Sequence, residues 1–246
     1  MRNSNLENGV QYLKGVGPKG AQVLAGMGIN TVYDILTHYP RNYEDRTNIK
    51  TISQFVNGES AVFIAEVVSD VKWNMIRRNF SVAYFFVEDE TGSCKITMFN
   101  RPYIKGKVNI GAKYAFYGKT EFKNGRWEIV NPEMVEESNI QKIQGIKPIY
   151  RLTKGITNTY IESLIKQLTQ NAMFELPEIF SEEFRKKYNL ADISFAFSQI
   201  HNPANFEAVD IARRRHIFEE LYLLELALMS IKKKVNILKG IEHEYI

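Results

Sequence analysis

The sequence predicts an α+β protein in which a small five-stranded β-barrel is flanked by helices on both sides. Three observations support this fold class. Alternating β-branched and aromatic runs fill only the middle of the chain, turn signals separate these runs, and helical periodicity occupies both ends. A chain of 246 residues with 44% hydrophobic residues is long enough for two or three compact units. We therefore predict an N-terminal helical segment (1–50), the barrel (51–142) and a C-terminal helical linker region (143–246).

Short helices are expected between Val10 and Tyr39, because apolar residues recur there at helical spacing and give each helix an apolar face. Pro40 should end this block, since proline cannot continue a helix. The apolar positions are Val23, Leu24, Met27, Ile29, Val32, Ile35 and Leu36.

A glycine-rich stretch, Gly15 to Gly20, opens this block and permits three interpretations. It matches the dinucleotide-binding pattern G-x-G-x-x-G, but no buried strand precedes it. Its spacing approaches that of a P-loop, but Ala21-Gln22 replace the phosphate- and magnesium-binding residues. The third interpretation is the turn of a helix-hairpin-helix, in which Gly15, Gly17 and Lys19 contact a phosphate. The alternative to all three is a turn between packed helices with no ligand.

Five short strands are predicted in the middle of the chain. Glu90-Thr91-Gly92 and Lys123-Asn124-Gly125 are turn sequences, and the second contains the Asn-Gly pair favoured in tight hairpins. Five strands in about 75 residues suit a partly open Greek-key barrel of the oligonucleotide/oligosaccharide-binding (OB) type. The predicted strands are 62–71, 80–87, 95–99, 113–117 and 127–130.

Gly145 and Pro148 mark a predicted linker after the barrel. Helices are then expected over 157–171, 178–188 and 207–238. The last is one long helix, with Ile211, Phe218, Leu221, Leu224 and Leu228 at helical spacing.

The most informative surface segment is Phe99-Asn100-Arg101-Pro102-Tyr103, which follows the third strand. Pro102 prevents the strand from continuing, so the segment should protrude at the edge of the barrel. Phe99 and Tyr103 offer flat faces on which bases stack, and Asn100, Arg101, Lys105 and Lys107 would contact the DNA backbone. The alternative is that the aromatic residues close the mouth of the barrel while the lysines keep its edge soluble.

Basic residues mark two further parts of the barrel. The net charge of +4 is only mildly basic, but between Phe99 and Arg126 the single acid Glu121 stands among seven basic residues. Lys119 and Arg126 join the candidate DNA contacts on this ground. Lys72, Arg77 and Arg78 form a second patch in a predicted loop between the first two strands, where OB barrels often bind ligands. Trp73 belongs either to this patch or to the core.

No catalytic or metal-binding motif is found. The four histidines, His38, His201, His216 and His243, lack a metal-binding spacing, and no nucleophile motif occurs. Glu88-Asp89-Glu90 is better explained as a solvated hairpin turn than as an acid/base pair. Arg213-Arg214-Arg215 would form a solvated helix face, or contact phosphate or another domain.

The single cysteine, Cys94, excludes a disulfide framework and a cysteine-based zinc site, which fits a reducing compartment. The N-terminus is polar, and no apolar run reaches the length that spans a bilayer. We expect a cytoplasmic protein that does not bind membranes and that holds no metal or cofactor in this chain.

The order of these motifs resembles the N-terminal region of the RecG family of ATP-dependent DNA helicases. The block Tyr43-Glu44-Asp45-Arg46 is the most specific part of the resemblance. The resemblance rests on 13–18, 33–46, 97–100, 148–150 and 213–221, which follow the family's order along nearly the whole chain.

The resemblance implies that the barrel is the family's wedge domain, which splits the arms of stalled replication forks and Holliday junctions while a motor pulls on duplex DNA. It implies that Phe99 and Tyr103 stack at the junction. The implied partners are branched DNA, single-stranded DNA and the protein's own motor domains, in recombination and repair. ATP and Mg²⁺ are expected in that motor only, because this chain ends at Ile246 before any motor motif.

Two other functions remain open from the sequence. The chain can be an OB-fold protein-interaction module with no direct DNA role, whose long C-terminal helix packs against an absent motor. It can also be an enzyme with an unrecognised site, against which the missing P-loop residues argue.

Overall fold

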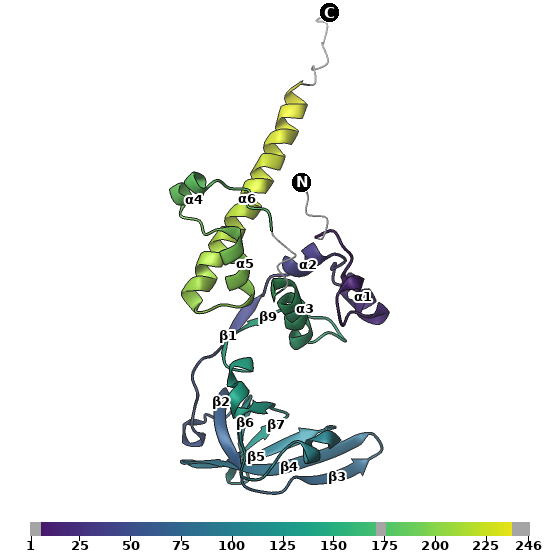
Figure 1. Cartoon of the computed structure of the whole chain (residues 1–246), viewed down its shortest axis with the longest axis vertical. Coiled ribbons are helices and arrows are strands. Elements are labelled where there is room, and N and C mark those ends of the chain that lie inside the picture. Colours follow the sequence, from purple (N-terminus) through teal and green to yellow (C-terminus); the bar gives the residue numbers. More distant parts are fainter. Residues whose placement is uncertain (1–5, 171–175, 238–246) are drawn as a thin grey trace, which may run out of the picture. The chain divides into compact units, whose positions relative to one another are not determined.

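The computed structural model describes residues 6–170 and 176–237 (Figure 1). It divides into two compact units, Glu44–Lys147 and the combination of Met1–Tyr43 with Pro148–Ile246. The predicted domain boundaries near residues 50 and 142 lie inside the first unit, Glu44–Lys147. The division into the three segments 1–50, 51–142 and 143–246 remains a prediction. The structure adds that the segments before and after the barrel belong to one unit.

The barrel is a ring of five strands: β2 (Ser60–Val67), β4 (Phe80–Asp89), β5 (Gly92–Phe99), β6 (Lys113–Lys123) and β7 (Arg126–Val130). Its order is β2-β4-β5-β7-β6, and pairing of β6 with β2 closes the ring. β5 and β7 run parallel, and the other neighbours are antiparallel. This is the strand order of an OB barrel, so the predicted fold class is confirmed. The closure is short at β2–β4, where only two residue pairs are in register.

Alternation along each strand fills the barrel. Phe63, Phe85, Phe116 and Ile96 are fully buried at its centre, as expected where every second side chain points inward. Asn124 and Gly125 both adopt positive φ (51° and 76°) in the predicted hairpin turn between β6 and β7.

A strand, β3 (Lys72–Arg77), replaces the predicted loop between the first two barrel strands. It pairs with β4 through a turn in which Asn79 has φ 64°. The prediction was wrong because most of β3 faces solvent, so it needs no apolar alternation. Trp73 is its one residue packed against the barrel core, which favours the core interpretation of this side chain.

Three further short strands were not predicted. β1 (Asn42–Arg46) pairs with β9 (Gly145–Ile149), and β8 (Glu133–Glu136) pairs with β6. Gly145 and Pro148 therefore lie in strand β9 and not in an irregular linker, although the chain does pass from one unit to the other between Lys147 and Pro148. A two-stranded sheet of five-residue strands carries too little pattern to be distinguished from a loop.

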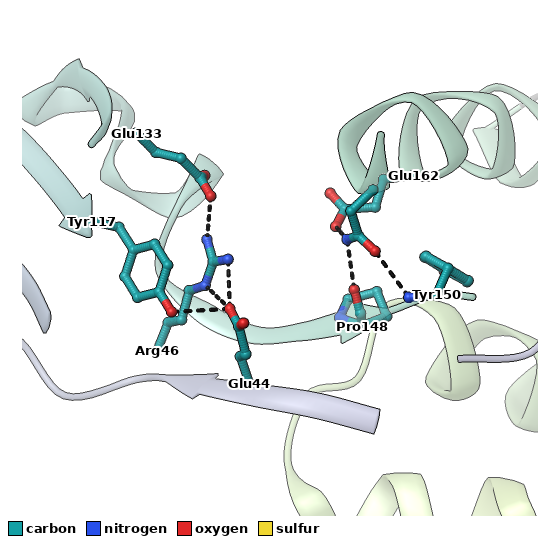
Figure 2. A network of polar contacts seen from close by, with 8 residues as sticks. Glu44, Arg46, Tyr117, Glu133, Pro148, Tyr150 and Glu162 are labelled. Carbon is teal, nitrogen blue, oxygen red and sulfur yellow. Dashed lines mark hydrogen bonds and ion pairs between the residues drawn. The ribbon is translucent and has the colours of Figure 1, made fainter. Parts of the chain in front are cut away.

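The Glu44-Asp45-Arg46 end of β1 is fixed to the barrel by Arg46 (Figure 2). Its guanidinium donates to Glu44 at 2.6 Å and to Glu133 at 3.0 Å, and it stacks on the ring of Tyr117 at 3.6 Å. Tyr117 donates its hydroxyl proton to Glu44 at 3.0 Å. Bidentate and stacked contacts are what arginine makes best, so lysine would not replace this residue.

The other unit is helical. Its helices are α1 (Pro18–Ala25), α2 (Val32–Leu36), α3 (Asn158–Gln170), α4 (Glu182–Tyr188), α5 (Ile193–His201) and α6 (Phe206–Ile237). Leu24 and Ile35 share one apolar core with Ile161 and Leu164, so the segments just before and just after the barrel fold together. Asn158 at the start of α3 donates to the carbonyl of Pro148 at 2.8 Å and accepts from the backbone of Tyr150 at 2.9 Å (Figure 2).

Most predicted helices are present, and their predicted last residues Asn171 and Leu238 lie outside the described residues. α5 was missed between two predicted helices. The prediction that Arg213-Arg214-Arg215 form a solvated helix face is wrong for Arg215, because this side chain is fully buried and paired with Glu178 and Glu219. In the described part of the chain, four 3-10 helices complete the elements: η1 (Val10–Tyr12), η2 (Ile52–Gln54), η3 (Pro102–Gly106) and η4 (Glu137–Lys142).

Candidate nucleic-acid interface

The outer face of β4 carries a row of aromatic side chains. Along this strand the half-buried Phe80, Val82, Tyr84 and Phe86 alternate with the buried residues of the core face. β4 lies between β3 and β5, so these two strands border the row on either side. The sequence prediction missed Phe80, Tyr84 and Phe86, although the period-two alternation of the strand contains the signal.

Phe99 ends β5 beside this row. It lies opposite Val82 in the register, and its ring stacks on that of Phe80 with centroids 5.5 Å apart. Its backbone N–H donates to the side chain of Asn131 at 2.8 Å. Phe99 is therefore half-buried at the end of a strand and held by two contacts.

Tyr103 follows on η3, which begins at Pro102 where the ladder of β5 has ended. Its side chain is 54% exposed. The ammonium of Lys107 lies 5.2 Å from the centre of its ring. The aromatic ring and the cation can thus meet a base and its phosphate together.

Asn100 and Arg101 have structural contacts of their own. Asn100 adopts φ 54°, accepts from the backbone N–H of Ser81 at 3.0 Å and donates its own N–H to the Ser81 carbonyl at 2.9 Å. Arg101 reaches the carbonyl of Pro132 at 3.5 Å. Asn100 thus closes the ends of β4 and β5, which explains an asparagine here without a ligand.

Cations lie over each outward ring of β4. Arg77 is 5.6 Å from the ring of Phe80, Lys72 is 5.9 Å from that of Tyr84, and Arg126 is 5.9 Å from that of Phe86. One face of the barrel therefore carries Lys72 and Arg77 from the predicted loop patch, Phe99 from the predicted edge segment, and Arg126 from the charge-rich segment.

The remaining predicted contacts are exposed but more scattered. Lys105 lies on η3, Arg78 lies in the turn between β3 and β4, and Lys119 lies on the part of β6 that pairs with β2. Lys119 therefore does not belong to the face formed by β3, β4 and β5.

The glycine-rich turn lies in the helical unit. Gly15 has φ +88°, Gly17 caps α1 and Pro18 is the first helical residue, as predicted, while Lys19 is exposed. The element before the turn is the 3-10 helix η1 rather than an α-helix. The carbonyl of Gly15 accepts a hydrogen bond from Tyr160 at 3.2 Å, so the turn also packs against α3.

Glu88 and Asp89 are the last residues of β4, and only Glu90 of the predicted turn lies in the turn itself, together with Thr91. Burial alone would raise the pKa of Asp89, but hydrogen bonds from Thr91, Ile52 and Gly92 outweigh it and lower this pKa below its usual value. Within residues 6–170 and 176–237 no group of three potential ligand side chains is placed to share a metal ion. Over the same ranges no helix is both long and apolar enough to cross a bilayer.

Comparison with known proteins gives consistent matches. A family model described as "RecG wedge domain" matches residues 9–171. "ATP-dependent DNA helicase RecG" of Thermotoga maritima is 30% identical over 94% of this chain and 30% of its own length. The Bacillus subtilis protein of the same description is 25% identical over 92% of this chain and 33% of its own length.

The solved "Structure of RecG bound to three-way DNA junction" matches with a TM-score of 0.81 and 29% identity, over 96% of this chain and 33% of that one. The chain thus spans about a third of the length of the curated relatives it matches.

Proposed function

Because the chain belongs to the RecG wedge-domain family, we propose that it binds branched DNA at the branch point. It acts within a longer protein that remodels stalled replication forks and Holliday junctions in recombination and repair. The observation that carries this proposal is the pair Phe99 and Tyr103. Phe99 ends the third barrel strand and stacks on Phe80 of the aromatic row, and Tyr103 follows on η3 with its ring more than half exposed.

In this proposal Phe99 and Tyr103 stack on the unpaired bases at the junction. Stacking on a ring stabilises a base by about 1–3 kcal/mol and is indifferent to sequence, which suits a protein that must act at any branch. The strand position of Phe99 supports the role, because a ring held by packing loses little entropy when it binds.

The cations on this part of the barrel would track the phosphates. Such contacts fix orientation without reading sequence, so the preference is for DNA shape. The members of this set are Arg101, Lys105, Lys107, Lys72, Arg77, Arg78 and Arg126. Lys119 and the turn with Gly15, Gly17 and Lys19 would contact phosphates elsewhere on the DNA.

The helicase activity would belong to motor domains of the longer protein, which would bind ATP and Mg²⁺ in the cytoplasm. α6 supports such a partner domain. Leu221, Leu224, Leu228 and Met229 on this helix are all at least half exposed. A helix with exposed apolar residues on several faces is typical of one that is buried in a larger protein. The same feature supports the second candidate, a protein-interaction module with no direct DNA role.

A gel-shift titration of the 246-residue chain with a fork, a plain duplex and a single strand, at two salt concentrations, separates the two candidates. We expect the tightest binding to the fork and a steep loss of all binding at the higher salt, because bound lysines and arginines release counterions from DNA. Equal affinity for fork and duplex would contradict the junction function and favour the protein-interaction module.

A further inference from the structure

We propose that β3 is a docking edge for an extended, acidic segment of a partner protein, which adds to the sheet as a further strand. The inference goes beyond the proposed function, because the ligand is a protein and the backbone of β3 makes the contacts. It does not depend on DNA binding by Phe99 or Tyr103.

β3 is an edge strand. In the described part of the chain it pairs with β4 on one side and with no strand on the other (Figure 1). Five of its six residues are exposed. An edge strand presents a row of unpaired N–H and C=O groups, to which a strand of another protein can bind.

The hydrogen-bond pattern of β4 shows which backbone groups of β3 are available. Ser81 donates its N–H to the side chain of Asn100 and accepts from the N–H of Asn100, so its polar groups point toward β5. The next residue of β4 faces β3 instead, and its register partner Asn74 faces β4. Trp73 and Met75, on either side of Asn74, therefore point their N–H and C=O groups away from β4. No backbone hydrogen bond of the described residues reaches these groups from that side.

This arrangement fits a peptide better than a nucleic acid. Each edge residue offers one donor next to one acceptor. A peptide backbone supplies both partners in turn, whereas the phosphates of DNA supply acceptors only. The edge therefore matches an extended peptide.

The two faces of β3 indicate the side chains that an added strand would carry. Trp73 and Met75 share the inner face, because alternate residues of a strand point the same way, and Met75 is 64% exposed. Lys72 and Arg77 lie on the outer face, over two outward rings of β4. A strand that alternates apolar and acidic residues would place its apolar side chains beside Met75 and its carboxylates beside the cations.

Charge favours an acidic partner over a second copy of this chain. The sequence has no acidic residue between Asp70 and Glu88, but it has Lys72, Arg77 and Arg78 there. Cations on an edge strand oppose pairing with a copy of the same strand, because like charges would meet. The same cations attract carboxylates, so they select an acidic strand.

The test is the fluorescence anisotropy of a labelled synthetic peptide of about seven residues that alternates glutamate and valine, titrated with the 246-residue chain. We expect saturable binding, and we expect no binding of the same peptide with lysine in place of glutamate. Two further peptides carry a methyl group on either the valine or the glutamate backbone nitrogens. One of these two should bind about tenfold more weakly, since only one set of nitrogens faces β3.

Met75→Pro is the matching change in the protein. Proline is tolerated on an edge strand where the N–H points outward, so the pairing with β4 should persist. We expect this variant to bind the acidic peptide about tenfold more weakly and to bind oligothymidylate as the wild type does. Met75→Leu keeps the N–H and should bind the peptide normally. The methylated peptides keep the test decisive if the proline variant folds poorly, because they require only the wild-type chain.

Three results would overturn the docking edge. The first is a wild-type chain that does not bind the acidic peptide, or that binds both methylated peptides as well as the unmodified one. The second is a wild-type dimer that Met75→Pro dissociates, which would show a second copy at β3. The third is an equal loss of peptide and oligothymidylate binding in Met75→Pro, which would show a nucleic-acid surface.

Discussion

His201 shows how single residues hold the helical unit together. Its ring is buried between the hydroxyl of Tyr150, 3.0 Å from Nδ1, and the carbonyl of Leu36, 2.9 Å from Nε2. These partners suit a neutral ring that donates from Nε2 and accepts at Nδ1. Burial lowers the pKa of His201 to about 4, and the hydrogen bond to Leu36 offsets this only in part.

This environment predicts a pH dependence of stability. The unfolded chain binds a proton on this histidine from about pH 6.5 downward, whereas the folded chain does so only near pH 4. The free energy of unfolding should therefore fall as the pH decreases from 6.5 to 4. His201→Gln should flatten this fall by up to about 1.4 kcal/mol per pH unit, as measured by urea denaturation at several pH values. The same slope in His201→Gln and in the wild type would contradict the assignment of this pH dependence to His201.

Burial also lowers the pKa of His216 to about 4, so His216→Gln should likewise flatten the fall of the free energy of unfolding with decreasing pH.

Some site residues were predictable from sequence and others were not. Phe99 and Tyr103 stand out in the sequence because Pro102 lies between them and indicates that the strand has ended. Tyr84 and Phe86 look like ordinary members of an alternating strand, since the sequence alone does not say which face of the barrel is covered. Asn100 shows the opposite case. Its position suggested a DNA contact, but the structure also explains it as a turn residue with positive φ.

At the scale of elements, closure of the barrel depends on a close approach at Gly118 of β6. A Cβ there would lie 2.7 Å from the side chain of Ile129 and 3.3 Å from that of Pro132. We expect Gly118→Ala to destabilise the barrel by about 1–3 kcal/mol through overpacking. Urea denaturation followed by tryptophan fluorescence measures this, because Trp127 packs against the barrel core.

Gly106→Ala is the matched control for this prediction, since a Cβ at that position meets no atom within 4 Å. Equal stability of Gly118→Ala and the control would show that the barrel relaxes around the added methyl group, contrary to our account.

Element prediction succeeded where many residues share one pattern. The five barrel strands and the long helix α6 each repeat their period several times. β1 and β9 are five residues long and stabilise each other only as a pair, so their evidence is non-local. β3 was missed for a different reason, because five of its six residues are exposed, Met75 and Ile76 among them, and Trp73 alone packs against the barrel core.

At the scale of the whole molecule, the chain joins two kinds of surface. The barrel carries rings and cations that suit DNA, and α6 carries exposed apolar residues that suit a protein partner. The sequence predicted both the barrel and the long helix, and it predicted the family through motifs spread along the chain. It could not predict that the first and last segments share one core, because such contacts join residues more than 100 positions apart.

The most direct test of the central claim compares fork and duplex binding in the wild type and in Phe99→Ala with Tyr103→Ala. Fluorescence anisotropy gives the ratio of the two dissociation constants under one salt condition. We predict that the double variant binds the fork about tenfold or more weakly while duplex binding changes by less than about twofold, because only the fork offers unpaired bases to these rings. Equal losses on fork and duplex would contradict the account.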